Sequence, residues 1–373
     1  MNRKPTDIEN TLKLGFGLMR LPKKLVSIDI EQTKKMVDMF MEAGFTYFDT
    51  AHVYPGSEDA IHEALFERYP RDSFTIATKL FVPAALSEGM AKKQFQTSLK
   101  RLGTDYIDYY LLHCIMENNY KKYEKFHLWD FVQEEKAKGN IRHVGFSFHA
   151  GPKLLDQLLT EHPEVEFVQL QLNYADWENP KVTSRANYEV ARKYGKRIVV
   201  MEPVKGGALA NPPKEIREMF SMYAPDMSPA SWAIRFVASL DGILTVLSGM
   251  SNIEQMADNL SYMKDFRPLN KDEQEIIHKA QKIMGASAVI PYTACRYCTK
   301  GCPQQIPIPD IFAAMNKRIG SGQIEESKAD YDKLTSNGIK ASGCIECGQC
   351  ESVCPQHISI IDTLKECSRT FEG

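Results

Sequence analysis

Residues 74–112 run Phe74-Thr-Ile-Ala-Thr78, then Met90-Ala-Lys-Lys-Gln-Phe-Gln-Thr-Ser-Leu-Lys-Arg-Leu102, then Ile107-Asp-Tyr-Tyr-Leu-Leu112. The outer two segments are short, apolar and rich in β-branched or aromatic residues, which is typical of buried strands. The middle segment has the spacing of an amphipathic helix. A strand, a helix and a second strand in this order indicate a parallel β/α unit.

The same rhythm continues from about residue 12 to residue 285. Further strands are predicted at Leu14–Leu18, Tyr47–Asp49, His143–Phe146, Phe167–Gln171, Ile198–Met201 and Leu244–Leu247. Further helices are predicted at Asp29–Ala43, Glu58–Arg68 and Ser228–Ser239. Eight strands alternating with helices predict an α/β fold, the (β/α)8 TIM barrel. A doubly wound sheet would place a glycine-rich dinucleotide turn after an early strand, and Gly15-Phe-Gly17 is only a short glycine pair.

The chain of 373 residues exceeds one ordinary core, so we expect two domains. Asn270 and Glu273 resemble a helix-capping box, and the amphipathic stretch that follows runs to about Met284 before Gly285. We therefore predict a barrel over residues 1–285 and a small, mainly helical ferredoxin-like domain over residues 286–373. The polar stretch Ser321–Ser342 is expected to be helix and loop.

Two cysteine runs define the second domain. The first is Cys295-Arg-Tyr-Cys298-Thr-Lys-Gly-Cys302-Pro303, and the second is Cys344-Ile-Glu-Cys347-Gly-Gln-Cys350-Glu-Ser-Val-Cys354-Pro355. The second has the full C-x2-C-x2-C-x3-C-P spacing of a [4Fe–4S] site, whose last cysteine ligates the neighbouring cluster. Zinc and disulfides are the alternatives, but zinc ribbons use C-x2-C pairs, and the odd total of nine cysteines without a secretion signal fits disulfides poorly.

The first run lacks one ligand when the two are overlaid on their Cys-Pro ends, because Tyr292 then stands opposite Cys344. One cluster would take Cys302, Cys344, Cys347 and Cys350. The other has only Cys295, Cys298 and Cys354, so it is a [3Fe–4S] cluster, a [4Fe–4S] cluster with a non-cysteine ligand, or absent. Cys367 lies on the helical pattern Ile360–Phe371 and is expected to be a buried thiol.

Charge and hydropathy exclude some classes of protein. The net charge is −2 with no long basic run, which argues against nucleic acid as a partner. No uninterrupted apolar stretch reaches about 18 residues, so no membrane span is expected. The first residues lack the apolar core of a secretion signal, and the expected location is a reducing cytoplasm.

Polar residues fall at the carboxyl ends of successive predicted strands, where barrel active sites form. Asp49, Lys79 and His113 each follow a strand, and Tyr54 lies on the loop after Asp49. A lysine beside a tyrosine favours the phenolate and lowers the phenol pKa. Asp49 would keep Lys79 charged, and His113 can hydrogen-bond a substrate oxygen. Together these residues predict a proton donor for a carbonyl that receives hydride.

Residues 10–265 resemble the aldo-keto reductase superfamily. The matching stretches are Gly15-Phe-Gly-Leu-Met-Arg-Leu-Pro22, Phe48-Asp-Thr-Ala-His-Val-Tyr54 with Gly56-Ser-Glu58, Ala77-Thr-Lys79 and Asp108-Tyr-Tyr-Leu-Leu-His113. The resemblance implies Tyr54 as general acid, Lys79 and Asp49 as its tuners, and His113 as the residue that orients substrate. It also implies a nicotinamide cofactor lying across the barrel mouth without a Rossmann domain.

The resemblance also implies cofactor-binding positions. They are Ser147, Gln169, Met201, Lys205, Gly206, Gly249, Ser251, Gln255, Asp258 and Asn259. Two departures from the family pattern are Phe148, where asparagine is common, and Met201, where an aromatic ring stacks on nicotinamide. The segment Ser248–Asn259 resembles the potassium-channel β-subunit branch and lacks the Lys and Arg that grip the 2′-phosphate elsewhere. The family favours NADP(H), and NAD(H) is not excluded.

A barrel of this kind followed by a ferredoxin-like segment resembles a bacterial and archaeal subgroup, which often carries cysteine where Tyr292 stands. The leading hypothesis is an NAD(P)H-dependent oxidoreductase that interconverts a small-molecule carbonyl and an alcohol. One alternative is an electron-transfer protein that couples nicotinamide to a ferredoxin-like, low-potential partner. The other is a redox sensor that retains nicotinamide with little turnover.

Overall fold

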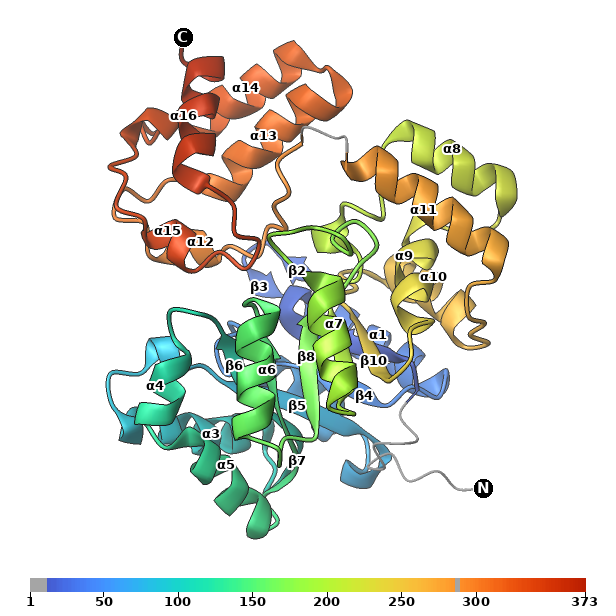
Figure 1. The fold of residues 1–373 in the computed structure, drawn as a ribbon, viewed down its shortest axis with the longest axis vertical. Helices are drawn as coiled ribbons and strands as arrows, with labels where there is room; N and C mark the ends of the chain where they lie inside the picture. The colour runs from blue at the N-terminus through green and yellow to red at the C-terminus, as the bar shows by residue number, and fades with distance from the viewer. Residues whose placement is uncertain (1–11, 286–288) are drawn as a thin grey trace.

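The computed structural model describes residues 12–285 and 289–373. Eight parallel strands close into a barrel in the order β1-β10-β9-β8-β7-β6-β5-β4, so the predicted (β/α)8 fold is confirmed (Figure 1). The barrel strands are β1 Leu14–Gly17, β4 Tyr47–Asp49, β5 Thr75–Leu80, β6 Ile107–Ile115, β7 Ile141–Phe148, β8 Phe167–Gln171, β9 Arg197–Met201 and β10 Ile243–Ser248. The short strands β2 Lys23–Lys24 and β3 Ser27–Ile28 pair only with each other.

Helices connect the strands. They are α1 Ile30–Glu42, α2 Ser57–Ile61, α3 Glu88–Leu102, α4 Tyr120–Lys125, α5 Leu128–Ala137, α6 Pro152–Glu161, α7 Ser184–Lys193, α8 Lys214–Tyr223, α9 Pro229–Ala238, α10 Ile253–Met263 and α11 Lys271–Gly285. The predicted capping box at the start of α11 is present. Asn270 N–H donates to Glu273 Oε2, and Glu273 N–H donates to Asn270 Oδ1, both at 2.9 Å.

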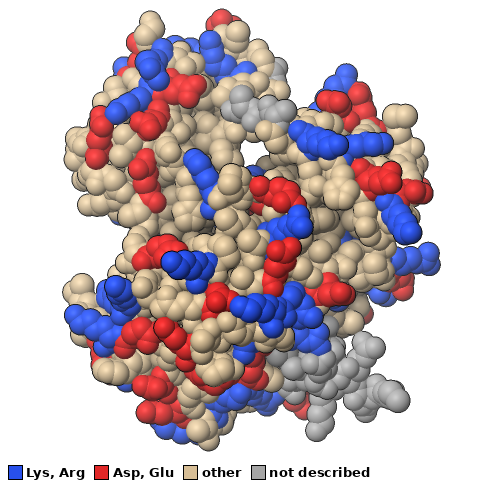
Figure 2. Space-filling model, viewed as in Figure 1, with Lys and Arg blue, Asp and Glu red and all other residues tan. Residues whose placement is uncertain are grey.

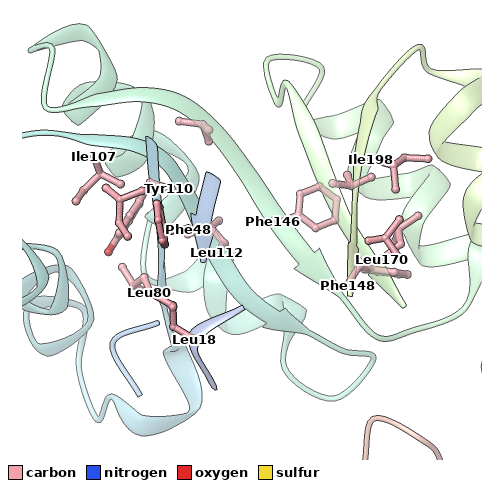
Figure 3. Close-up of a cluster of buried hydrophobic side chains, with 14 of the residues drawn as sticks. Leu18, Phe48, Leu80, Ile107, Tyr110, Leu112, Phe146, Phe148, Leu170 and Ile198 are labelled. Carbon is pink, nitrogen blue, oxygen red and sulfur yellow. The ribbon is translucent and has the colours of Figure 1, made fainter. Parts of the chain in front are cut away.

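Successive side chains along each strand point alternately into the barrel and towards the helices, which gives two apolar layers. The barrel interior is filled by Tyr47, Tyr109 and Phe167, which pack together as one buried cluster. Intervening residues such as Phe48 and Phe146 belong to the larger cluster between strands and helices (Figure 3). Gly145 is required by the inner layer, because a Cβ there would lie 2.6 Å from the Phe167 ring.

The C-terminal region, residues 289–373, is helical as predicted. Its helices are α12 Tyr297–Lys300, α13 Ile308–Ser321, α14 Ile324–Leu334, α15 Gln349–Ser352 and α16 Ile360–Phe371. It has a buried core of its own, separate from those of the barrel, and Cys367 lies fully inside it as expected. The predicted domain limits stay a prediction, and residues 1–11 and 286–288 within them lie outside the described part of the chain.

The C-terminal region stacks on one end of the barrel (Figure 1). Arg20 joins the two parts, donating to Thr293 O at 2.6 Å and to Gly206 O at 3.1 Å. The amides of Gln171 and Gln356 donate to each other at 3.1 and 2.9 Å. The barrel mouth is therefore covered by residues that follow it in the sequence.

The surface carries charges of both signs. Figure 2 shows Lys and Arg interspersed with Asp and Glu over the face in view. Within residues 12–285 and 289–373, no helix has both the length and the apolar character that a membrane crossing requires.

Candidate active site

Six of the predicted site residues share the inward face of the barrel strands. Residues two apart along a strand point to the same side. Tyr47 and Ala77 pack inside the barrel, so Asp49 and Lys79 point inward one step nearer the carboxyl ends of β4 and β5. By the same alternation, four further residues point into the barrel: His113 on β6, Ser147 on β7, Gln169 on β8 and Met201 on β9.

A cavity of about 560 Å³ lies at this end of the barrel, and we call it the mouth cavity. Its lining includes the predicted site residues Asp49, Tyr54, His113, Ser147, Gln169, Met201, Gly206, Gly249, Ser251, Gln255, Asp258 and Asn259. Two predicted residues are outside the lining. Lys79 lies behind the wall, and Lys205 is held in a buried ion pair with Asp176.

Lys79 is fully buried and lies close to three residues: Asp49, Thr50 and the predicted acid Tyr54. Its Nζ donates to Asp49 Oδ1 at 2.6 Å and to the Thr50 carbonyl at 2.7 Å. It also lies 5.1 Å from the centre of the Tyr54 ring. Burial lowers the pKa of Lys79, and the carboxylate of Asp49 opposes that shift.

The expected lowering of the Tyr54 pKa is wrong for this structure. Loss of solvent in the cavity raises the pKa of Tyr54 well above its ordinary value, and the nearby carboxylate of Asp49 acts in the same direction. The ammonium of Lys79 is already committed to Asp49 and the Thr50 carbonyl. Tyr54 is therefore a phenol that keeps its proton, and its raised pKa makes it a weaker acid than an ordinary tyrosine.

His113 is a neutral imidazole. Burial lowers its pKa well below the ordinary value, and the neighbouring Lys79 charge adds to this effect. Its ring meets that of Tyr54 edge-on with centroids 5.8 Å apart. Its Nδ1 is buried without a hydrogen-bond partner. A neutral imidazole that donates through Nε2 can hold a substrate oxygen beside Tyr54.

The cavity offers unsatisfied polar atoms that fit a nicotinamide dinucleotide. Gln169 Oε1 and Asn259 Oδ1 are buried without partners. Ser147 Oγ accepts the Cys114 N–H at 2.7 Å, which leaves its own hydrogen free to donate. Buried polar atoms normally find partners, so a ligand with amide and hydroxyl groups would complete these positions.

Several further lining residues were not placed at the site from the sequence, among them His149, Gln171, Glu202, Cys295, Tyr297 and Gln356. His149 and Gln171 lie at the ends of β7 and β8, so the strand-end rule could have found them. Cys295, Tyr297 and Gln356 come from the C-terminal region. Their position depends on how that region packs on the barrel, which no local pattern encodes.

The seven predicted cluster ligands gather in two groups. Cys302, Cys344, Cys347 and Cys350 line one small cavity together with the apolar side chains of Ile306, Ile308, Ile361 and Leu364. Cys298 interacts electrostatically with Cys295 and Cys354 and also with Cys350 of the other group, and all three add to the effect of burial in raising the pKa of Cys298. The four cysteines that share the small cavity are the set that the exchange of the fourth cysteine between clusters implies, and that set fits an iron–sulfur cluster.

Comparisons with known proteins agree with this architecture. Residues 13–282 match the model of the aldo/keto reductase family, and residues 293–359 match that of the 4Fe-4S dicluster domain. An aldo-keto reductase of Mycobacterium avium is 27% identical over 277 residues, covering 73% of this chain and 87% of its own length. An aldo-keto reductase of the fungus Strobilurus tenacellus is 28% identical over 239 residues, covering 58% of this chain and 68% of its own length.

Solved structures show the same barrel. The holo form of an aldo-keto reductase from Bacillus halodurans superposes with a TM-score of 0.58 at 25% identity, covering 72% of this chain and 91% of its own. A Klebsiella pneumoniae aldo/keto reductase in complex with NADP and acetate gives a TM-score of 0.60 at 18% identity, covering 75% and 95%. The chain belongs to the aldo/keto reductase family, and its barrel is followed by a 4Fe-4S dicluster domain.

Proposed function

We propose that the protein reduces a small-molecule carbonyl with NAD(P)H, or oxidises the matching alcohol, at the mouth cavity. The observation that carries this proposal is the shared lining of one cavity by Tyr54, His113 and the predicted cofactor residues. The reduced nicotinamide would supply the hydride that the carbonyl carbon accepts. Tyr54 gives its proton to the carbonyl oxygen, and His113 donates a hydrogen bond to the same oxygen.

The test is Tyr54→Phe, which removes the proton and little else. General acid catalysis is worth about 10²–10⁴-fold, so the single-turnover rate of nicotinamide oxidation by a panel of aldehydes and ketones should fall by that factor. The dissociation constant of the cofactor should stay the same. Tyr188→Phe removes a hydroxyl that bonds to Asp241 O outside the cavity and serves as the control. An unchanged rate in Tyr54→Phe would show that Tyr54 is not the general acid.

A second candidate function is electron transfer between nicotinamide and a low-potential partner such as a ferredoxin. It is favoured by Cys295, a predicted cluster ligand that lines the same cavity. A hydride is equivalent to two electrons and a proton. Each cluster takes one electron, so both clusters would be needed to accept one hydride equivalent, and the proton would pass to solvent. Anaerobic addition of NADH or NADPH, with the visible absorbance of the clusters as the readout, distinguishes this function from carbonyl reduction.

A further inference from the structure

The loop that follows β9 holds a carboxylate in a strained position. Glu202 comes directly after β9 with a φ of 55°, in the left-handed region that residues other than glycine rarely adopt. Its Oε2 accepts the Gly206 N–H at 2.6 Å, and its Oε1 lies 3.6 Å from Nη2 of Arg20. Strained backbone of this kind gathers at ligand-binding sites, where the surrounding contacts hold it in place.

Arg20 lies where the middle of an extended dinucleotide is expected. Its Nη1 donates to the Gly206 carbonyl at 3.1 Å, in the loop that follows the predicted nicotinamide-binding residue Met201. On its other side, a Cβ on Gly249 would lie 3.9 Å from Arg20 Cδ, at the start of the predicted adenosine segment. Among the described residues that line the mouth cavity, Arg20 is the only lysine or arginine. The pyrophosphate is the part of a dinucleotide that joins its two halves.

The guanidinium of Arg20 is held at the cavity wall and keeps donors for an anion. Its hydrogen bonds to the carbonyls of Gly206 and Thr293 use two of the five N–H groups that a guanidinium offers. Thr293 belongs to the C-terminal region and packs directly on the loop, because a Cβ on Gly206 would lie 2.6 Å from Thr293 Cα. Both parts of the chain therefore fix this cation, and Glu202 is the carboxylate that pairs with it.

We propose that Arg20 and the Gly206 N–H bind the pyrophosphate of the nicotinamide dinucleotide, and that Glu202 occupies these two donors when no nucleotide is bound. This inference rests on the proposed function. A carboxylate and a phosphate group accept hydrogen bonds from a guanidinium and from backbone N–H groups in similar ways. Glu202 is therefore an internal competitor of the nucleotide. The apparent affinity is reduced by the fraction of the protein in which Glu202 holds the donors.

The first experiment is Glu202→Gln in the full, cluster-containing protein. The amide oxygen can still accept the Gly206 N–H, so the loop keeps its hydrogen bond while the negative charge is lost. Anaerobic calorimetric titration should show NAD⁺, NADP⁺ and ADP-ribose each binding about five- to thirtyfold more tightly, because all three carry the pyrophosphate. Glu215→Gln, at an exposed position of α8 outside the cavity lining, is the matched control and should leave the three dissociation constants unchanged.

The second experiment removes the cation. Arg20→Met should weaken binding of the same three ligands by about tenfold or more, and it should make their affinity less sensitive to salt. Arg20→Lys keeps the charge but not the planar fork of donors, so its dissociation constants should fall between those of Arg20→Met and the wild-type protein. Because Arg20 also bonds to the C-terminal region, the iron and sulfide contents of both variants are measured and should equal those of the wild-type protein.

Unchanged or weaker binding of all three ligands by Glu202→Gln would overturn the proposal, because a carboxylate with a purely structural role gives that result. Tightening confined to NADP⁺ would equally overturn it, since the effect would then belong to the 2′-phosphate. If the wild-type protein and its variants bind the nucleotides as described but reduce no carbonyl, the proposed function fails and this inference stands. Carbonyl reduction by a protein whose nucleotide affinity ignores Glu202→Gln gives the reverse. Absence of nucleotide binding in every variant would overturn both.

Discussion

The buried pair Lys79–Asp49 shows how the site is held together at the scale of single residues. Both side chains are almost fully buried, and their contact of 2.6 Å offsets the cost of removing two charges from water. Asp49 Oδ1 accepts from Lys79, and Asp49 Oδ2 is buried without a hydrogen-bond partner. The pair thus tolerates the simultaneous loss of both charges better than the loss of one.

We predict that Lys79→Met lowers the free energy of unfolding by about 3–5 kcal/mol, because the carboxylate of Asp49 is left buried and unpaired. Asp49→Asn together with Lys79→Met should recover a substantial part of that loss. Urea denaturation of the single and double variants checks this. A double variant whose loss equals the sum of the two single losses would show that the residues do not act as a pair.

His149 gives the stability a pH dependence. Burial lowers its pKa from 6.5 to about 4, and the charge of His357 adds to the shift. The unfolded chain takes up this proton near pH 6.5, whereas the native protein resists it until about pH 4. The contribution of neutral His149 to the free energy of unfolding is therefore fully present above pH 6.5 and is lost as the pH falls towards 4.

We predict that His149→Asn becomes steadily more stable relative to the wild-type protein as the pH falls from 7 to 5, by at most about 1.4 kcal/mol per pH unit. Urea denaturation at several pH values measures the difference. Parallel pH curves for the two proteins would show that the pKa of His149 is close to its ordinary value in the native state.

At the scale of elements, the start of α10 sets the charge of the cavity wall at which we expect the adenosine half of the cofactor. Asn252 caps this helix by accepting the Gln255 N–H at 2.8 Å. Glu254 and Asp258 line the cavity there, and Arg20, which pairs with Glu202, is the one Lys or Arg among the lining residues. A 2′-phosphate would meet carboxylates, so NADPH should bind no more tightly than NADH.

The corresponding prediction is that Glu254→Lys tightens NADPH binding about tenfold and leaves NADH binding within about twofold, since only NADPH carries the added phosphate. Fluorescence titrations at low and high salt measure both constants, and Glu254→Gln separates the loss of a negative charge from the gain of a positive one. Equal changes for the two nucleotides would place the 2′-position away from Glu254.

The barrel elements and their site residues could be predicted because they follow from local patterns. A strand buried on both faces is a short apolar run, and period-two alternation then fixes Asp49, His113 and Gln169 at its inner end. The pKa of Tyr54 could not be predicted, because it depends on how much water the packed cavity excludes. Tyr297 was missed because its place in the cavity wall depends on the packing of two separate cores.

At the scale of the whole molecule, the two cysteine groups differ in completeness and in place. The group with four cysteines lies within the C-terminal region, among apolar side chains. The group with three includes Cys295, which lines the mouth cavity. Tyr292 stands at the position where the sequence spacing predicts a fourth cysteine. The centre of its ring lies 6.1 Å from the centre of the Phe312 ring. The incomplete group is therefore the one nearer to the catalytic chemistry.

We predict that the cluster held by Cys295, Cys298 and Cys354 loses iron on exposure to air, because an iron without a thiolate is open to water and oxygen. Electron paramagnetic resonance should then show a [3Fe–4S] signal beside an intact [4Fe–4S] centre. Tyr292→Cys restores the spacing and should abolish that signal, whereas Tyr292→Phe should not. If the wild-type protein holds two equally stable [4Fe–4S] clusters, another side chain completes the site. Cys114 is then the first to replace, because its thiol is a buried electrostatic neighbour of Cys295.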